Sequence, residues 1–376
     1  MGRAILRVRS IASTLTAGAG LPNKRATARK RGAPYALAMR SDLRAPRAAL
    51  ILVLLLAACG GGQLASQGPT LDPGPTSSNP IASPATGCVA APAPASNLPG
   101  WTTAAKPPTI FPVIVNSTGS LTCGENRLLF TFLDATNRPI GAPDRTASVA
   151  LFNLGRDGST AIERFDGRFV WGIENERGFY VANVTFPEAG RWGAEFATTV
   201  NGGAPELVRM VFDVATSSPV VRVGQHAPAS DTLTAASVDG SLVRISTDAH
   251  PDPAFYRTSV KDALAAHQPF VLIFATPKFC TSAQCGPTLD RVKPLAADFP
   301  TVAFIAVEPY LLTYQNGSLQ PVLDANGELQ AVPAVGEWGL LSEPWVFVVN
   351  RDGIVTASFE GVVATDEIRA ATEAIK

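Results

Sequence analysis

Short runs rich in β-branched and aromatic residues follow one another between about Ile110 and Val214, with turn residues between them. Their lengths and spacing are typical of antiparallel strands that pack as two sheets. The pattern therefore predicts an all-β sandwich domain over residues 109–216. The runs that carry this prediction are FPVIV, NRLLFTFLD, ASVALFNL, GFYVANVTF, RWGAEFATT and ELVRMVFDV.

The hydrophobic pattern changes beyond residues 217–254, which are predicted to be a linker. Residues 255–376 alternate between continuous apolar runs, as in buried strands, and stretches with apolar residues three and four apart, as on one face of a helix. This order predicts an α/β domain, and hence a multidomain chain. Strands are expected at 270–275, 302–307, 346–350 and 354–359, and helices at 258–267, 287–299 and 365–375.

The segment before the sandwich has a different composition. Residues 60–108 consist largely of Gly, Pro, Ser, Thr and Ala, with almost no aromatic or branched apolar side chains. Such a segment cannot bury enough surface to offset the entropy lost on ordering. Residues 59–108 are therefore predicted to be a disordered tether without secondary structure.

The N-terminal region carries an apolar run from Ala48 to Ala58, preceded by Arg44 and Arg47. Its 11 residues suit the core of a signal peptide, which needs about 7–15, and not a membrane span, which needs roughly 20. The sequence Leu-Ala-Ala-Cys that ends at Cys59 resembles the lipobox of bacterial lipoproteins. That resemblance implies cleavage before Cys59, lipid on its sulfur and a place in the cell envelope outside the cytoplasm, whereas a plain secretory signal is the alternative.

Residues 1–58 are thus read as a basic leader and lipoprotein signal peptide, whose true start is suspected at Met39. Eleven of the 31 Lys and Arg residues but only one of the 31 Asp and Glu residues precede Cys59. The remaining 318 residues therefore carry a formal charge of −10, which repels phosphate backbones and argues against nucleic-acid binding. At about 150 residues per domain, this length suggests two domains.

The stretch from Gly178 to Trp192, GFYVANVTFPEAGRW, resembles the late strands of immunoglobulin-like sandwiches of the YtkA and CopC kind. Some of those relatives bind copper through His and Met. The predicted sandwich has no His and only Met210, so the ligands that copper prefers are missing. No copper site is therefore predicted in the sandwich, and no metal or cofactor is predicted elsewhere in the chain.

Three motifs in residues 255–376 resemble the thioredoxin-like superfamily. The strand FVLIFA runs into TPKFCTSAQCGP, which places Cys280 and Cys285 where a strand meets a helix. The sequence SEPW precedes the strand VFVV, where the family has a cis-proline beside its active cysteines, and NRDGIVTASFEG resembles the family's closing hairpin. The resemblance implies a catalytic Cys280 and Cys285 pair, a cis peptide at Pro344 and a substrate-binding loop that includes Glu343 and Pro344.

The spacing of the cysteine pair departs from the family, because four residues and not two separate Cys280 from Cys285. In the usual motif the first thiol lies at a helix N-terminus, where free N–H groups stabilise the thiolate. Here Cys280 matches the first position of the pair, whereas Cys285-Gly286-Pro287 matches the familiar start of the helix. The nucleophile stays open, with a preference for Cys280 attacking and Cys285 resolving.

Two alternatives compete with redox exchange. The first is a fixed structural disulfide between Cys280 and Cys285, because the cysteines of exported proteins tend to be oxidised. Such a bond would suit a non-catalytic interaction protein. Peroxiredoxins of the bacterioferritin-comigratory kind use a similar cysteine pair. They need a threonine shortly before the attacking cysteine, where this chain has Pro277.

The parity of the cysteines gives one more prediction. With Cys59 lipidated and Cys280 paired with Cys285, two of the five cysteines are left, Cys88 and Cys123. They are predicted to form a structural disulfide, with two free thiols as the alternative.

The sequence as a whole predicts a membrane-anchored thiol–disulfide oxidoreductase or redox-partner protein that acts on exported proteins with exchangeable thiols. Residues 309–338 are a candidate partner-binding insert.

Overall fold

The computed structural model describes residues 88–94, 98, 100–101 and 108–376. All of these residues belong to one unit by their mutual contacts. The signal segment, Cys59 and most of the predicted tether lie outside the described residues. Among the residues that are described, no helix combines the length and the hydropathy that crossing a membrane requires.

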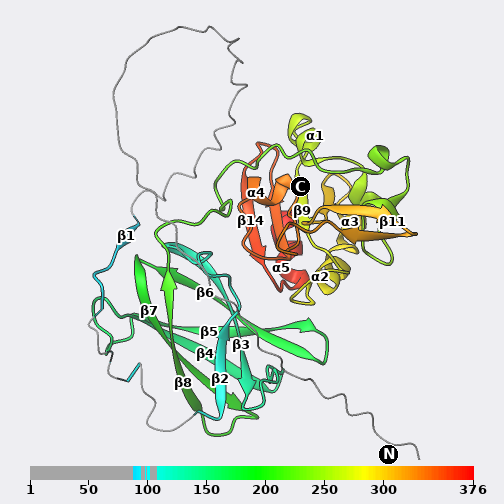
Figure 1. Cartoon of the computed structure of the whole chain (residues 1–376). Coiled ribbons are helices and arrows are strands. Elements are labelled where there is room, and N and C mark those ends of the chain that lie inside the picture. Colours follow the sequence, from blue (N-terminus) through cyan, green and yellow to red (C-terminus); the bar gives the residue numbers. More distant parts are fainter. Residues whose placement is uncertain (1–87, 95–97, 99, 102–107) are drawn as a thin grey trace, which may run out of the picture. The chain divides into compact units, whose positions relative to one another are not determined.

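The strands between residues 110 and 214 form a β-sandwich, as the sequence predicts (Figure 1). In the described part of the chain their hydrogen-bonded order is β1-β7-β4-β5-β6-β3-β2, with β8 paired to β7. Strand β5 links the two layers, because its residues 163–167 pair with β4 and its residues 168–173 pair with β6. The bounds are β1 (Val89–Ala90), β2 (Ile110–Ile114), β3 (Gly124–Asp134), β4 (Arg145–Asn153), β5 (Glu163–Ile173), β6 (Arg177–Phe186), β7 (Glu188–Val200) and β8 (Glu206–Val214).

The core of the sandwich comes from every second residue of its strands, because successive side chains of a strand point to opposite faces. Strands β3, β4, β6 and β7 each contribute such a set, and aromatic rings fill the space between the layers. All six predicted runs are strands, whereas the sequence pattern missed β5. The narrower likeness to the YtkA and CopC kind stays a prediction. The fully buried aromatic side chains of this core are Phe130, Phe132, Tyr180, Phe186, Trp192 and Phe196.

The predicted tether is wrong for the part of it that the structure describes. Val89 and Ala90 form the short strand β1, which pairs in parallel with β7 at Glu188 and Ala189. Trp101 is only 9% exposed and packs edge-on against a phenylalanine of β4. A disulfide between Cys88 and Cys123 attaches this segment to the sandwich. Composition alone did not reveal these anchors, because one cysteine and one tryptophan hold an otherwise weakly apolar segment.

Removing the Cys88–Cys123 disulfide is expected to destabilise the sandwich. The bond closes a loop of sequence separation 35, for which the chain-entropy model gives roughly 3–4 kcal/mol of unfolding free energy. The measurement is urea unfolding of a Cys88→Ser, Cys123→Ser chain beside the wild type. Equal unfolding free energies for the two proteins would contradict the expectation.

Residues 270–360 contain a four-stranded sheet with the order β10-β9-β13-β14 among the described strands. Strands β9 and β10 are parallel, and β13 runs antiparallel to both β9 and β14. Every residue of β9, β10 and β13 is buried, including those of the edge strand β10, as expected for strands covered on both faces. The bounds are β9 (Phe270–Phe274), β10 (Ala303–Val307), β13 (Trp345–Val349) and β14 (Val355–Glu360).

Helices cover both faces of this sheet. Val271, Ile273, Val346 and Val348 face one cluster, which includes residues of α2, α3 and α5. The alternate residues of the same strands face a second cluster, which includes residues of α1 and α4. The bounds are α1 (Val260–Ala265), α2 (Cys285–Val292), α3 (Leu295–Asp298), α4 (Pro333–Glu337) and α5 (Thr365–Glu373).

The structure departs from the sequence pattern in the helix predicted at 287–299. This stretch is two helices, α2 and α3, and Pro294 lies between them. Proline removes a backbone donor and clashes with the preceding turn, so the apolar face continues while the helix does not.

The predicted linker, residues 217–254, is also packed and partly helical. It contains the short 3-10 helices η1 (Ala235–Val238) and η2 (Leu242–Arg244), followed by η3 (Pro253–Tyr256). Its backbone bonds to β14 and to the β13–β14 turn, through Gly224 to Val355 and Ala227 to Gly353.

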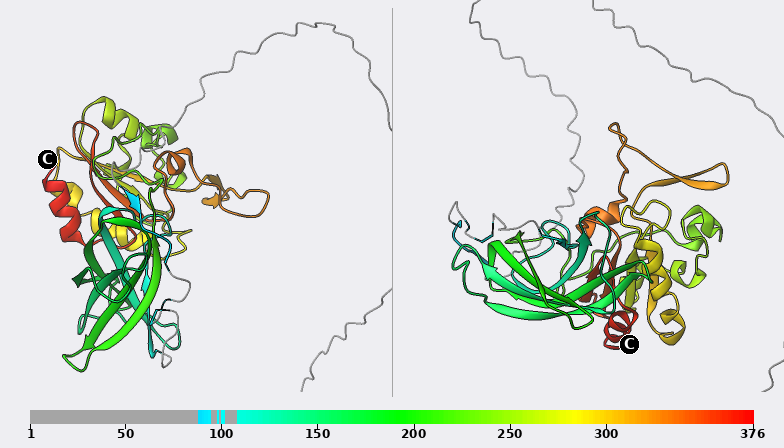
Figure 2. Two further views of the ribbon diagram at one scale, coloured as in Figure 1. Left: turned by 90° about the vertical axis from the view of Figure 1, so that its left-hand side faces the viewer. Right: turned by 90° about the horizontal axis from the view of Figure 1, so that it is seen from below.

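The predicted insert at 309–338 holds a two-stranded hairpin, β11 (Leu312–Gln315) and β12 (Ser318–Pro321). Both views of Figure 2 show this hairpin, drawn in orange, projecting from the rest of its unit. Tyr314, two residues before the turn of the hairpin, is 42% exposed.

Candidate functional site

Three segments meet at one end of the four-stranded sheet. The loop of residues 275–284 leaves the carboxyl end of β9, and Glu308 to Tyr310 leave the carboxyl end of the parallel neighbour β10. Because Trp345 at the start of β13 pairs with Phe274 at the end of β9, residues 342–344 arrive at the same place. Crevices at the carboxyl ends of parallel strands are where ligands commonly bind in such sheets.

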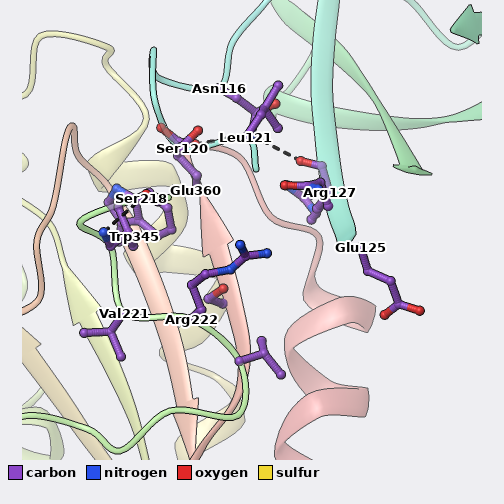
Figure 3. A pocket seen from close by; sticks show the side chains of 14 residues that line it. Asn116, Ser120, Leu121, Glu125, Arg127, Ser218, Val221, Arg222, Trp345 and Glu360 are labelled. Carbon is purple, nitrogen blue, oxygen red and sulfur yellow. Dashed lines mark hydrogen bonds between the residues drawn. The ribbon is translucent and has the colours of Figure 1, made fainter. Parts of the chain in front are cut away.

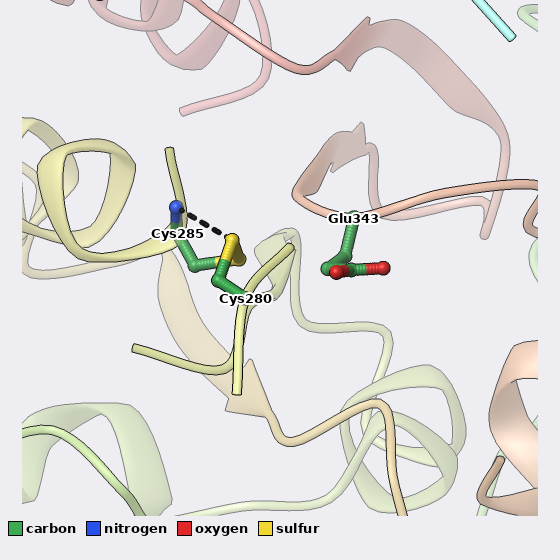
Figure 4. Close-up of side chains that lie close together, drawn as sticks. All are labelled: Cys280, Cys285 and Glu343. Atoms are coloured by element: carbon green, nitrogen blue, oxygen red, sulfur yellow. Dashed lines mark hydrogen bonds between the residues drawn. A yellow bond between two sulfur atoms is a disulfide. The ribbon is translucent and has the colours of Figure 1, made fainter. Parts of the chain in front are cut away.

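Cys280 and Cys285 form a disulfide at this end of the sheet (Figure 4). Cys285 is the first residue of α2 and has no exposed surface, whereas Cys280 lies in the preceding loop and is partly exposed. The backbone N–H of Cys285 donates a hydrogen bond to Cys280 Sγ over 3.3 Å. One free N–H group of the helix start is therefore directed at the more exposed sulfur.

The loop of residues 342–344 lies beside these cysteines. The Glu343–Pro344 peptide is cis, as predicted. Ser282 lies between the two segments: its hydroxyl donates to the backbone oxygen of Glu343 over 3.2 Å and lies 3.3 Å from Cys280 Sγ. Ser282 thus connects Cys280 to the loop that holds Glu343 and Pro344.

The carboxylate of Glu343 is buried, with 9% of the residue exposed. The hydroxyl of Tyr310 donates to its Oε2 over 2.8 Å, and the backbone N–H and hydroxyl of Thr281 donate to its Oε1 over 3.3 and 3.2 Å. Burial, together with the neighbouring Glu343 carboxylate, raises the pKa of Tyr310, so the phenol stays a neutral donor. Sequence reasoning missed Tyr310 and Thr281, because only the fold brings the start of the insert to the cysteine loop.

Two charged residues near the cysteine loop, Lys278 and Glu308, contact other segments of the chain. Lys278 is exposed, and its amine donates to the backbone oxygen of Leu319 in β12 over 3.1 Å, which links the cysteine loop to the hairpin. Glu308 is half-buried and accepts hydrogen bonds from the backbone N–H and hydroxyl of Thr247 over 2.6 and 2.7 Å. Burial raises the pKa of Glu308 above its ordinary value of 4.5, although the hydrogen bonds oppose the shift.

Replacing Glu308 with glutamine is expected to make folding less sensitive to pH. A raised pKa means that the folded state holds the proton more tightly, so this stabilisation is present below about pH 4.5 and is lost as pH rises through the folded value. Glu308→Gln should therefore gain stability relative to the wild type between pH 4.5 and neutral pH. Urea unfolding at several pH values measures this difference.

The matched control is Glu328→Gln, a change at an exposed carboxylate in the turn between β12 and α4. It should leave the pH dependence of unfolding as in the wild type. A difference between Glu308→Gln and wild type that is constant across pH would show that the Glu308 proton is not linked to folding.

A separate cavity of about 340 Å³ lies against β3, β13 and β14 (Figure 3). Arg222 lines it and donates to the backbone oxygen of Cys123 over 3.3 Å, and burial lowers the pKa of this guanidinium. Trp345 also lines it, and its indole N–H has no hydrogen-bond partner among the described residues. Arg127, Glu125 and Glu360 also line this cavity. Its lining therefore carries both positive and negative charge, which favours neither an anionic nor a cationic ligand.

The structure thus brings together Cys280, Cys285, Glu343 and Pro344. Cys88 and Cys123 form the predicted second disulfide, which joins β1 to the loop before β3. Cys59 lies outside the described residues.

No protein-family model matches the chain, and no curated protein matches it. Solved structures show limited similarity. CopC from Methylosinus trichosporium OB3b has a TM-score of 0.18 and 8% identity, covering 28% of this chain and 93% of that one. A DUF4426 family protein from Pseudomonas aeruginosa PAO1 has a TM-score of 0.20 and 9% identity, covering 29% and 91%. The filamin domain of Lin-41 has a TM-score of 0.17 and 11% identity, covering 28% and 93%. Values this low assign neither a family nor an activity to this chain.

Proposed function

We propose that residues 255–376 form a thioredoxin-like unit that exchanges the Cys280–Cys285 disulfide with thiols of exported proteins. Support for the fold comes from the strand order β10-β9-β13-β14 and from helices on both faces of the sheet. Support for the chemistry comes from the position of the pair at a strand-to-helix junction beside residues 342–344. This proposal requires a sulfur that a partner can reach and a second sulfur that can resolve the intermediate.

The difference in exposure between the two sulfurs carries the proposal. Cys285 has no exposed surface, so the sulfur of a large partner can reach only Cys280. The N–H of Cys285 lies 3.3 Å from Cys280 Sγ, where it would stabilise a thiolate once the disulfide opens. Cys280 is therefore assigned as the attacking sulfur and Cys285 as the resolving one.

The exchange has two steps. In the reduced chain, the Cys280 thiolate attacks a partner disulfide, forms a mixed disulfide and releases one partner thiolate. The Cys285 thiolate then attacks Cys280 Sγ, re-forms the intramolecular bond and releases the second partner thiolate. Two electrons pass to the partner, and the two protons of the protein dithiol end on the partner dithiol. The reverse sequence oxidises a partner dithiol.

A redox titration of the full-length protein in detergent tests the proposal. Alkylation and peptide mass analysis in glutathione or dithiothreitol buffers give the midpoint for the Cys280–Cys285 pair. Working oxidoreductases lie between about −120 and −270 mV, so a midpoint in this range is expected. A bond that stays closed below about −300 mV in the folded protein would instead indicate a structural disulfide in a non-catalytic interaction protein.

The location proposed for this chemistry is the bacterial cell envelope outside the cytoplasm, at a membrane to which lipid on Cys59 attaches the chain. The apolar run before Cys59 and the Leu-Ala-Ala-Cys motif support export and lipid attachment at Cys59. An extracytoplasmic location suits disulfide chemistry, because such compartments allow disulfides to persist. Exported proteins with exchangeable thiols are the partners that fit this location.

A further inference from the structure

The carboxylate of Glu343 lies beside the two cysteines, although disulfide exchange does not require a carboxylate there. One ligand atom each from Cys280, Cys285 and Glu343 lie within 4.8 Å of one another (Figure 4). Cys285 and Glu343 are buried and Cys280 is partly exposed. The three side chains come from different segments, so the fold assembles this group and the sequence spacing does not reveal it.

Surrounding hydrogen bonds hold the Glu343 carboxylate in place. It accepts bonds from the Tyr310 hydroxyl and from the backbone N–H and hydroxyl of Thr281. These are the kind of outer contacts that orient a carboxylate ligand of a metal. All of these donors are uncharged, so the described hydrogen bonds bring no positive charge to this buried group.

Opening the disulfide increases the negative charge that this site can hold. The three ligand atoms lie within 4.8 Å of one another in the disulfide form, so two thiolates and one carboxylate would be close neighbours once the bond opens, and like charges this close repel strongly in a buried site. A bound cation removes this repulsion. Thiolate ligands favour zinc over calcium or magnesium, and zinc also accepts carboxylate oxygen.

We propose that the reduced chain binds one Zn²⁺ through Cys280 Sγ, Cys285 Sγ and one carboxylate oxygen of Glu343. Binding releases the two thiol protons and changes no oxidation state. The fourth position of a tetrahedral site is left for water or for a ligand from a partner. Zinc binding and the disulfide exclude each other, because both use the same two sulfurs. The site therefore binds metal only when the pair is reduced.

The test uses the full-length protein in detergent, reduced with a thiol-free phosphine and then freed of reductant without oxygen. Zinc chloride is titrated against a chromophoric chelator, and Co²⁺ is used in parallel to detect sulfur-to-metal charge-transfer absorption. One zinc ion per reduced chain is expected beyond that bound by a Cys280→Ser, Cys285→Ser chain. That control keeps Cys88 and Cys123, so it accounts for any metal held by those thiols.

Variants of the carboxylate and its support separate this site from a simple dithiol. Glu343→Gln is expected to weaken zinc binding at least about 10-fold, and Tyr310→Phe about 10- to 100-fold, because outer hydrogen bonds contribute that much in metal sites. Glu328→Gln, at an exposed position, should bind as the wild type does. Wild-type affinity in both Glu343→Gln and Tyr310→Phe would overturn the proposal, as would a reduced wild type without excess zinc. A disulfide that the phosphine cannot open in the folded protein would overturn it too.

This inference goes beyond the proposed exchange and fails separately from it. Zinc binding by the reduced chain, with a disulfide that exchanges with no partner thiol, would support the metal site and remove the exchange activity. Exchange at an ordinary potential without zinc binding would support the activity and overturn the metal site.

Discussion

Cys285→Ser is expected to accumulate a mixed disulfide at Cys280, whereas Cys280→Ser is expected to form none at Cys285. The cause is the difference in access, since Cys285 has no exposed surface and Cys280 is partly exposed. Each variant also lacks the second sulfur of the pair, so a mixed disulfide once formed at Cys280 cannot be resolved. The result should be close to all-or-none.

The measurement is incubation of each folded variant with glutathione disulfide, followed by intact-protein and peptide mass analysis. Cys285→Ser should gain one glutathione, located at residue 280, and should react with an alkylating reagent at least about 10-fold faster than Cys280→Ser, because thiolate character and access set the rate. Cys88 and Cys123 are bonded to each other and serve as an internal control that should gain no adduct. Equal labelling of the two variants would reject the assignment of Cys280 as the attacking sulfur.

Most of the strands could be predicted because their apolar side chains are grouped in short runs between turn residues. This holds for β9, whose five residues are all buried and read as a continuous apolar run. Strand β5 was missed for the opposite reason. Its first half, ERFDG, is rich in charge because the three charged residues remain exposed while this half of the strand pairs with β4.

Segments held by a few long-range contacts could not be predicted from local composition. Residues 88–101 contain few branched apolar side chains, yet Cys88 bonds to Cys123 and the indole of Trp101 donates to the backbone of Gly158 over 2.8 Å. The predicted linker at 217–254 is likewise held by contacts with residues distant in the sequence. Its backbone finds partners along β14 and its neighbouring turn, and these partners are invisible in a one-dimensional pattern.

The candidate site was predictable to the extent that the motifs point to one end of the sheet. The junction after β9 and the proline before β13 place Cys280, Cys285 and Pro344 together once the sheet order is known. Tyr310 could not be included, because its role depends on how the chain leaves β10. Tyr310 and Thr281 together hold the Glu343 carboxylate, so the metal-binding hypothesis arises only from the fold.

Cys59→Ser is expected to remove lipid from the protein and to release it from the membrane fraction. The apolar run of 11 residues before Cys59 is too short for a stable span, so lipid on this cysteine would be the anchor. A single acyl chain gives marginal binding and several chains give stable attachment, which makes the expected change nearly complete. Labelling cells with a fatty-acid analogue, followed by fractionation, measures both effects.

Cys88→Ser is the matched control, since it removes another cysteine near the N-terminal region but leaves Leu-Ala-Ala-Cys intact. It should be labelled as the wild type is. Equal labelling of Cys59→Ser and wild type would reject lipid attachment at this residue.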